Sequence, residues 1–400
     1  MSMSTTAPTS KVELAKRAAQ VAGHVAWEKA SRFKAISRSD IPASSQSVTK
    51  EWLTAVLCDA HPGAQIVNFS IVNASAGTST RWGIDVTYNS KGQAAGLPRR
   101  VFVKTTTSFP QRLILGAANV IGGEIGFYSS IRPNLEIETP QGYFAGIDEQ
   151  SWRSVVVLED IAVTRGAQFS SPTTKVTLEN MKDLVGDMAS FHGRYWNDPS
   201  LEQHPDWLKS PLAHLEQISR FIGMRRRSEI GFQRAAAVQP AALNGRYDDL
   251  WTGLERSLDL ASRGPQTFLH GDTHVGNTYT TSSGRMGFTD WQVIVRGLWA
   301  YDLAYIVTTA LTVDDRRTHE HELVRYYLER LAETGVAAPS FDEAWLAYRQ
   351  QTFYPCFAWL LTIGRSAIQP KMQTDATSLA LLERTFTAIV DLESFAAIGL

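Results

Sequence analysis

The strand-forming runs of this chain are concentrated in its first 160 residues, whereas the rest of the chain mostly follows a helical pattern. The three strongest runs, rich in β-branched and aromatic side chains and separated by turn clusters, are residues 66–75, 79–88 and 99–107. Apolar side chains recur at helical spacing over residues 175–261 and 314–400. The pattern predicts an α+β protein with an antiparallel sheet in a sheet-rich N-terminal lobe, followed by a helix-rich C-terminal lobe.

The length of 400 residues allows two or three domains, each large enough to bury a core. A helical pattern over residues 11–36 ends before a polar stretch and predicts an N-terminal helical appendage. The balance between strand and helix changes after Asp160. We therefore expect an appendage over residues 1–37, a sheet-rich lobe over residues 38–160 and a helix-rich lobe over residues 161–400.

The chain carries almost no net charge, because 39 basic side chains balance 40 acidic ones. Without a cationic field, we expect neither nucleic acid nor an anionic membrane as a partner. The two cysteines, Cys58 and Cys356, lie far apart without metal-ligand spacing, so we expect neither a disulfide framework nor a zinc site. No segment has the pattern of a secretory signal, and the longest uncharged apolar stretch, residues 353–363, is too short to span a bilayer. These features predict a cytoplasmic protein.

The segment with the most chemical information spans residues 268–291. An apolar run leads into a loop that carries His270, Asp272 and Asn277, and a predicted two-stranded hairpin then leads to Asp290. Carboxylate and amide side chains at such spacing are the groups that orient a hydroxyl or hold a hard cation.

The register of this hairpin follows from its turn. If Ser283 and Gly284 form a two-residue turn, Asn277 lies opposite Asp290 at the open end of the hairpin. Directly opposed residues have Cβ atoms roughly 4.5–5.5 Å apart. An amide oxygen and a carboxylate at that separation share a cation such as Mg²⁺. Asp272 then lies beside the cation without binding it.

Phosphoryl transfer requires one carboxylate to orient and deprotonate a hydroxyl, and an Asn and an Asp to hold Mg²⁺ on the nucleotide phosphates. The spacing from Asp272 to Asn277 matches the kinase catalytic loop H-R-D-x-x-x-x-N, with Gly271 in place of Arg. The segment HGDTHVGN, followed by TDWQ and YDLAY, resembles the aminoglycoside phosphotransferase and choline kinase superfamily, and most of all its ecdysteroid-kinase-like branch. The likeness covers most of the chain.

This resemblance implies a bilobal, protein-kinase-like fold that binds Mg²⁺ and ATP, with GTP as an alternative donor. Asp272 would be the catalytic base and would contact the acceptor, whereas Asn277 and Asp290 would hold the metal. The resemblance also implies that His270 braces the catalytic loop through hydrogen bonds, although the residue type alone equally allows a ligand or a base. Asp302 is a second candidate for bracing the loop.

Two alternatives to a kinase stay open. His270, Asp272 and His274 form an HxDxH string that a metal-dependent hydrolase could use, although no second histidine pair of suitable spacing occurs among the nine histidines. A non-catalytic nucleotide-binding protein could also retain the fold, although all the expected polar positions are occupied.

A kinase also needs a cation for the α- and β-phosphates. Lys91 and Lys104 are the only lysines between residues 51 and 160. Lys91 lies in a Ser-Lys-Gly turn, whereas Lys104 ends an apolar strand, from which its side chain would point into a cleft. We therefore expect Lys104 to bind phosphate, and the resemblance implies that Glu124 fixes it by an ion pair. Alternatively, Glu124 is a surface residue.

Two further segments would contact the nucleotide. Backbone N–H groups and hydroxyls between the first two strands could cap phosphate oxygens, and these residues are Gly77, Thr78, Ser79 and Thr80. Residues 155–161 resemble the last strand and hinge of the N-terminal lobe, where backbone groups including those of Glu159 and Ile161 would bind adenine. The basic run Arg225–Arg227 is either a solvated helix face or an anionic substrate contact.

We therefore expect residues 38–160 to bind the nucleotide and residues 161–400 to hold the catalytic loop and acceptor pocket. The expected acceptor is a small, largely apolar alcohol of aromatic, alicyclic or steroid-like type, because aromatic side chains could line a pocket around Asp272. Those lining residues are Trp299, Tyr354, Phe357 and Trp359. The same rings could instead be core residues. Alternative acceptors are a polar or cationic aminoglycoside- or choline-like alcohol, or a hydroxyacyl-CoA. The chain is expected to act as a monomer or homodimer.

Overall fold

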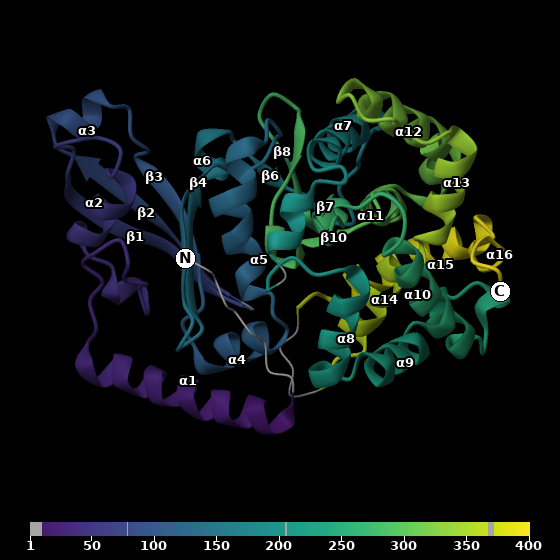
Figure 1. Cartoon of the computed structure of the whole chain (residues 1–400), viewed down its shortest axis with the longest axis horizontal. Coiled ribbons are helices and arrows are strands. Elements are labelled where there is room, and N and C mark those ends of the chain that lie inside the picture. The colour runs from purple at the N-terminus through teal and green to yellow at the C-terminus, as the bar shows by residue number, and fades with distance from the viewer. Residues whose placement is uncertain (1–9, 78, 205, 367–371) are drawn as a thin grey trace. The chain divides into compact units, whose positions relative to one another are not determined.

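The computed structural model describes residues 10–77, 79–204, 206–366 and 372–400 (Figure 1). Contacts divide the chain into two compact units. The first unit comprises Met1–Asn134 and Pro140–Gly166, and the second comprises Leu135–Thr139 and Ala167–Leu400. The expected division into an appendage, a sheet-rich lobe and a helix-rich lobe stays a prediction.

The first unit is built on one five-stranded antiparallel sheet, in the order β1-β2-β3-β5-β4. The strands are β1 (Ile66–Ala76), β2 (Thr80–Tyr88), β3 (Arg100–Thr105), β4 (Gly142–Asp148) and β5 (Arg153–Glu159). Strand β5, which lies between β3 and β4, is buried along nearly its whole length, so its run of valines has no alternation, as expected for a strand covered on both faces. The predicted antiparallel sheet is confirmed.

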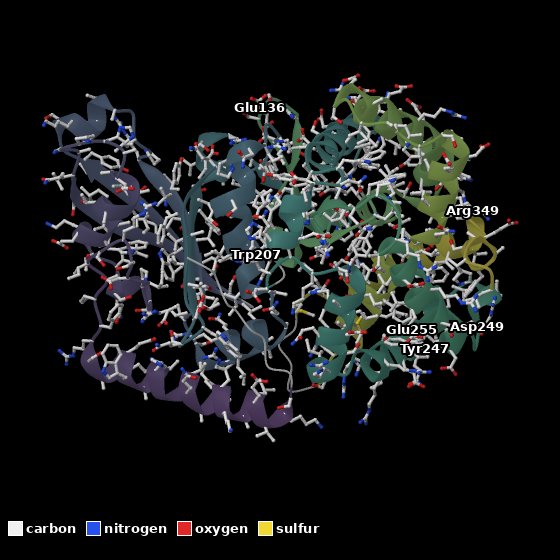
Figure 2. All side chains as sticks on the ribbon, in the orientation of Figure 1. Glu136, Trp207, Tyr247, Asp249, Glu255 and Arg349 are labelled. Carbon is white, nitrogen blue, oxygen red and sulfur yellow. The ribbon has the colours of Figure 1, made fainter. Side chains whose placement is uncertain are left out.

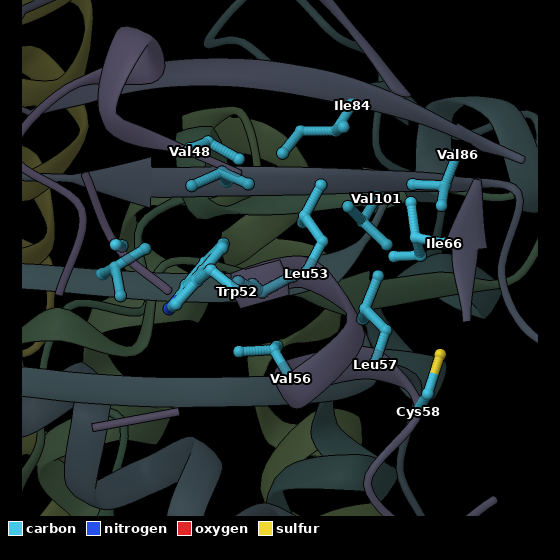
Figure 3. Close-up of a cluster of buried hydrophobic side chains, with 14 of the residues drawn as sticks. Val48, Trp52, Leu53, Val56, Leu57, Cys58, Ile66, Ile84, Val86 and Val101 are labelled. Atoms are coloured by element: carbon cyan, nitrogen blue, oxygen red, sulfur yellow. The ribbon is translucent and has the colours of Figure 1, made fainter. Parts of the chain in front are cut away.

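Six helices of different lengths accompany this sheet in the described part of the first unit. They are α1 (Lys11–Ser31), α2 (Lys50–Leu57), α3 (Ser90–Ala94), α4 (Phe109–Ala117), α5 (Ile121–Gly126) and α6 (Ile161–Thr164). Thr49 caps α2 by accepting a hydrogen bond from the Trp52 N–H. In Figure 3, Trp52, Leu53 and Leu57 of α2 lie in one buried cluster with side chains of the sheet such as Ile84 and Val101.

Helix α1 is tied to the rest of the first unit by a buried carboxylate. Glu28 accepts two hydrogen bonds from Arg112 of α4, at 2.8 and 2.6 Å, and one from Arg153 of β5, at 3.1 Å. All three side chains are buried. Charge-assisted, bidentate contacts of this kind fix geometry strongly, so the segment expected to be an appendage is an integral part of the first unit.

The second unit is mainly helical. Its helices are α7 (Leu178–Arg194), α8 (Pro211–Ile222), α9 (Met224–Arg234), α10 (Tyr247–Ala261), α11 (Ala300–Ala310), α12 (Val313–Glu333), α13 (Phe341–Gln350), α14 (Phe353–Ile363), α15 (Asp375–Asp391) and α16 (Ser394–Ala397). Helix α10 is amphipathic: it buries Tyr247 and Leu250 and leaves Asp249 and Glu255 exposed (Figure 2). The predicted α+β class is confirmed. No helix in the described part of the chain has the length and apolar character needed to cross a membrane.

Two small sheets hold the loops of the second unit. One pairs β7 (Thr267–Leu269) with β10 (Val295–Gly297), and the other has the order β6 (Gln168–Phe169), β8 (Thr278–Thr280), β9 (Met286–Phe288). Fully buried rings of Phe191, Phe268, Phe288 and Trp291 pack against one another beside these strands. This aromatic core supports the polar loop that follows β7.

Candidate active site

The loop after β7 is held by a buried carboxylate from α11. Asp302 accepts hydrogen bonds from the backbone N–H groups of His270, at 2.7 Å, and Gly271, at 2.9 Å. The Thr273 hydroxyl donates to the Asp302 carbonyl at 2.9 Å. Because both carboxylate oxygens accept backbone donors, Asp302 fixes the course of the loop immediately before Asp272.

Gly271 occupies the position at which the kinase loop has Arg. Its φ is +80°, in the left-handed region that favours glycine. A Cβ atom built on Gly271 would lie 2.1 Å from the Val293 carbonyl oxygen. The loop and the segment before β10 approach too closely for any side chain, so this chain requires glycine here.

His270 is fully buried and uses both of its ring nitrogens within the loop region. Nε2 lies 3.0 Å from the Thr289 carbonyl, to which it donates, and Nδ1 accepts from the Asp272 N–H at 3.3 Å. The ring also lies 4.4 Å from that of Trp291. Both ring nitrogens of His270 are thus engaged by groups of the protein backbone.

The Asp272 carboxylate is 29% exposed and is held by neutral donors. The Tyr305 hydroxyl donates to Oδ1 at 3.0 Å. The Asn277 amide donates to Oδ2 at 3.1 Å and to the Asp272 carbonyl at 2.8 Å. The carboxylate is thus fixed in direction while part of it stays accessible, which is the condition that a general base must meet.

His274 lies beside the same carboxylate. Its Nδ1 accepts from the Gly276 N–H at 3.0 Å, and its Nε2 is 3.7 Å from Asp272 Oδ2. Burial lowers the pKa of His274, which favours the neutral ring. The ring packs against Trp359 of α14, with centroids 5.1 Å apart.

The hairpin register differs from the prediction by one residue. Thr278 pairs with Phe288, and the Thr289 N–H donates to the Asn277 carbonyl at 2.9 Å, so Asn277 lies opposite Thr289 rather than Asp290. The predicted two-residue turn is wrong because the loop has three residues, 282–284, and ends at Gly284 with φ +89°.

Asp290 therefore does not face Asn277 across the strand pair. It leaves the strand in the left-handed conformation, with φ 62° and ψ 63°, and precedes the 3₁₀ turn Trp291–Val293. Side chains no longer alternate between two faces of a strand at this position. The strand register therefore does not support the predicted shared cation site, although Asn277 and Asp290 both remain candidate Mg²⁺ ligands.

The donor chemistry of Asn277 fits a magnesium ligand. Its amide nitrogen is used on Asp272, and among the described residues no hydrogen bond engages its Oδ1. An amide oxygen and a carboxylate are suitable ligands for Mg²⁺. By contrast, no group of three or more His, Cys, Asp or Glu residues in the described ranges could hold a metal ion. His270, Asp272 and His274 thus do not form such a group.

The four predicted acceptor rings occupy two different environments. Tyr354 lies 5.8 Å from Tyr305, and Trp359 contacts His274, so both are close to the residues around Asp272. Trp299 and Phe357 are core residues, since Trp299 stacks on Tyr327 at 4.6 Å and Phe357 packs on Trp251 at 5.6 Å. Trp299 and Phe357 are both buried, and their role in the acceptor pocket stays a prediction.

In the first unit, Lys104 of β3 and Glu124 of α5 form a buried ion pair. The Lys104 Nζ lies 3.1 Å from Oε1 and 2.9 Å from Oε2 of Glu124, and each side chain is only 8% exposed. The alternative that Glu124 is a surface residue is therefore wrong. Lys91 lies on the exposed helix α3.

The predicted phosphate loop joins β1 to β2 and is tied to α4 by Gln111. The Gln111 amide donates to the Gly77 carbonyl at 2.9 Å, and its Oε1 accepts from the Thr80 hydroxyl at 3.1 Å. Ser79 is buried and accepts from Arg81 at 3.3 Å. Thr78, also predicted to bind phosphate, lies outside the described residues. Gln111 was not anticipated, although the Ser-x-x-Gln capping box at the start of α4 is visible in the sequence.

The predicted hinge follows β5. Glu159 donates its N–H to the Gln141 carbonyl at 2.8 Å, and its carboxylate accepts from Thr164 at 2.6 Å and Arg165 at 2.9 Å. Burial opposes ionisation of Glu159, but these donors lower its pKa overall. Ile161 is buried and begins α6. Glu159 is thus engaged within its own unit.

Similar solved structures include choline kinase LicA from Streptococcus pneumoniae, at 12% identity and a TM-score of 0.48, covering 86% of this chain and 97% of that one. An ethanolamine kinase from Plasmodium vivax is 11% identical at a TM-score of 0.48, covering 82% and 84%. The GDP and kanamycin complex of APH(2")-IIia is 13% identical at 0.45, covering 77% and 89%. No curated protein matches the sequence significantly.

The family match is independent of these distant structural likenesses. Residues 123–347, more than half of the chain, match the phosphotransferase enzyme family known as APH. The matched region contains the loop with Asp272, Asn277 and Asp290, as well as Glu124. The family predicted from the motifs and the predicted enzyme class are confirmed. The chain therefore belongs to the APH phosphotransferase enzyme family.

Proposed function

We propose that this chain transfers the γ-phosphoryl group of ATP, or alternatively GTP, to the hydroxyl of a small, largely apolar alcohol. The observation that carries the proposal is the Asp272 carboxylate, which is partly exposed, oriented by Tyr305 and Asn277, and set in a loop fixed by Asp302. Phosphoryl transfer depends mainly on positioning and charge stabilisation, and a rigid loop supplies the first of these.

In the proposed reaction Asp272 accepts the proton of the acceptor hydroxyl. The hydroxyl oxygen forms a bond to the γ-phosphorus, the bond from that phosphorus to the β,γ-bridging oxygen breaks, and the nucleoside diphosphate leaves with the bonding electron pair. The proton passes to Asp272 and then to solvent. A base of this kind contributes roughly 10²–10⁴-fold to the rate.

We assign the metal, the phosphates and the adenine of the nucleotide to separate sets of residues. When bound, Mg²⁺ would neutralise phosphate charge, and Asn277 and Asp290 are the side chains that would hold it. Lys104 would bind the phosphates while its ion pair with Glu124 keeps the ammonium in one position. The Gly77–Thr80 loop would cap phosphate oxygens, and backbone groups at Glu159 and Ile161 would contact adenine.

The character of the acceptor follows from the groups that surround Asp272. Tyr305, Tyr354 and Trp359 are aromatic and almost fully buried, and His274 favours the neutral form. Such surroundings suit an aromatic, alicyclic or steroid-like alcohol better than a polycation. The named acceptors of similar structures, choline, ethanolamine and kanamycin, carry positive charge, so a cationic alcohol is the alternative to be tested, together with a hydroxyacyl-CoA.

The proposal is tested by an acceptor screen with Mg²⁺ and radiolabelled ATP or GTP. The panel contains benzyl alcohol, cyclohexanol and a soluble hydroxysteroid as neutral acceptors, kanamycin and choline as cationic ones, and a 4-hydroxyacyl-CoA. We expect Mg²⁺-dependent transfer to a neutral alcohol. Efficient transfer to kanamycin or choline alone would reject the apolar acceptor while retaining the kinase, and absence of nucleotide turnover would reject the kinase.

A further inference from the structure

The two oxygens of the Asp272 carboxylate have different neighbours. Oδ1 accepts the Tyr305 hydroxyl at 3.0 Å, whereas Oδ2 accepts the Asn277 amide at 3.1 Å and faces His274 Nε2 at 3.7 Å. A separation of 3.7 Å is too long for a hydrogen bond. Asp272 Oδ2 and His274 Nε2 therefore lie close together without forming a hydrogen bond.

The tautomer of His274 follows from its other nitrogen. Nδ1 accepts from the Gly276 N–H at 3.0 Å, so in the neutral ring the hydrogen must reside on Nε2. Among the described residues, no acceptor lies within hydrogen-bond distance of this Nε2–H. In this part of the chain, the Nε2–H group of His274 is thus a donor without an acceptor. It lies beside Asp272 Oδ2, the carboxylate oxygen to which Tyr305 does not donate.

Resting on the proposed function, we infer that the acceptor hydroxyl binds between His274 Nε2 and Asp272 Oδ2, so that His274 is a substrate-contacting residue. A single oxygen can lie about 2.8 Å from both atoms when they are 3.7 Å apart. The hydroxyl oxygen accepts from His274 Nε2–H, and its own hydrogen is donated to Asp272 Oδ2. The proton that the reaction removes is thereby aimed at the base before the transfer.

This arrangement selects for the chemical type of the acceptor group. A hydroxyl is both a donor and an acceptor, whereas a protonated amine has only donors and would leave His274 Nε2–H unsatisfied. Asp272 alone would attract an ammonium group. His274 therefore favours an alcohol over an amine at the reacting position, and Tyr305 acts as a positioning residue by occupying Oδ1.

Two substitutions of His274 separate its two nitrogens. In His274→Asn the side-chain oxygen can still accept from the Gly276 N–H, as His274 does in capping the 3₁₀ turn Val275–Asn277, but the donor at the Nε2 position is lost. In His274→Gln the amide nitrogen can reach the Nε2 position. His319→Gln, on α12, is the control for a histidine outside the site.

The variants are assayed with Mg²⁺·ATP and the best acceptor among benzyl alcohol, cyclohexanol and a soluble hydroxysteroid. We expect His274→Asn to lower kcat/KM for the alcohol about tenfold or more, the effect of one lost hydrogen bond. KM for ATP and the melting temperature should stay close to those of the wild type. His274→Gln should recover most of the loss, and His319→Gln should match the wild type.

Three outcomes would overturn the inference. These are unchanged alcohol kinetics in His274→Asn, an equal loss in the Asn and Gln variants, and a rise in KM for ATP that parallels the loss with the alcohol. The last two would assign a structural role to His274. A wild-type chain that turns over neither ATP nor GTP would contradict the proposed function itself, and this result is distinguishable because it appears before any variant is compared.

Discussion

The Lys104–Glu124 pair and the Asp272 loop hold charged groups in opposite ways. Lys104 and Glu124 are both buried, and each compensates the charge of the other at about 3 Å. Asp272 is partly exposed and is held by the hydroxyl of Tyr305 and the amide of Asn277, which carry no charge. In the ion pair, each charge is compensated by its partner. In the loop, hydrogen bonds fix the direction of the Asp272 carboxylate and leave its negative charge available.

From this difference we predict which substitution should mainly lower folding stability and which should mainly lower the reaction rate. Removing one partner of a buried ion pair leaves an uncompensated charge in the interior, which strongly destabilises a fold. Removing the charge of a partly exposed carboxylate with neutral partners costs the fold little, but it removes the base. The loss of folding stability should therefore be larger in the Lys104–Glu124 pair than at Asp272.

The largest effect is expected at the base. Asp272→Asn should lower the rate of phosphoryl transfer by roughly 10²–10⁴-fold. The fold and nucleotide binding should be retained, because the side-chain oxygen of Asn can still accept from Tyr305. Steady-state rates measured beside nucleotide binding by calorimetry test this separation. Near-native turnover would reject Asp272 as the base.

The next effect concerns the phosphate ligand of the first unit. Lys104→Met should lower kcat/KM for ATP by roughly 10²–10³-fold, the usual loss when one preorganised electrostatic group is removed. Lys91→Met is the matched control, since Lys91 is exposed on α3. Both variants are compared by initial rates over a range of ATP concentrations, and equal losses in the two would exclude a special role for Lys104.

An effect on stability tests the comparison itself. Glu124→Gln removes a negative charge beside the buried Lys104 and should lower the free energy of unfolding of the first unit by about 3–5 kcal/mol. Asp272→Asn should lower the stability of the second unit by only about 1 kcal/mol. Denaturant titrations of both variants measure this. A smaller loss of unfolding free energy in Glu124→Gln than in Asp272→Asn would contradict this comparison.

The smallest of these effects concerns the metal. Asp290→Ala should raise the Mg²⁺ concentration required for half-maximal rate by about tenfold or more, the equivalent of about 1.4 kcal/mol of lost binding. Asp342→Ala, at an exposed position of α13, is the control. Titration of the rate with Mg²⁺ decides the matter, and an unchanged Mg²⁺ requirement would remove Asp290 from the metal site.

Local patterns in the sequence predicted the fold well, because strands and helices are encoded by neighbouring residues. The antiparallel strands were recognisable from β-branched runs. The contacts that complete the site were not recognisable. Tyr305 reaches Asp272 from 33 positions away, and Glu28 reaches Arg112 from 84 positions away, so only the tertiary fold brings these pairs together.

The error in the hairpin register and the ambiguity of the aromatic positions have definite physical causes. The hairpin register depended on loop length, and Ser282, Ser283 and Gly284 form a three-residue loop where a two-residue turn was expected. The aromatic positions could not be divided into pocket and core, because hydrophobicity is the same signal in both. Trp299 and Trp359 have nearly equal burial, yet only Trp359 packs against a side chain that lies beside Asp272.

The central claim, that this chain moves a phosphoryl group to an alcohol, is tested most directly by product identification. The wild-type chain is incubated with Mg²⁺·ATP and an equimolar mixture of the alcohols of the screen, and the products are analysed by mass spectrometry beside those of Asp272→Asn. The account predicts ADP together with one phosphate monoester of a neutral alcohol for the wild type, and almost none of that monoester for the variant. ADP with inorganic phosphate and no monoester, or the same monoester yield from Asp272→Asn, would contradict it.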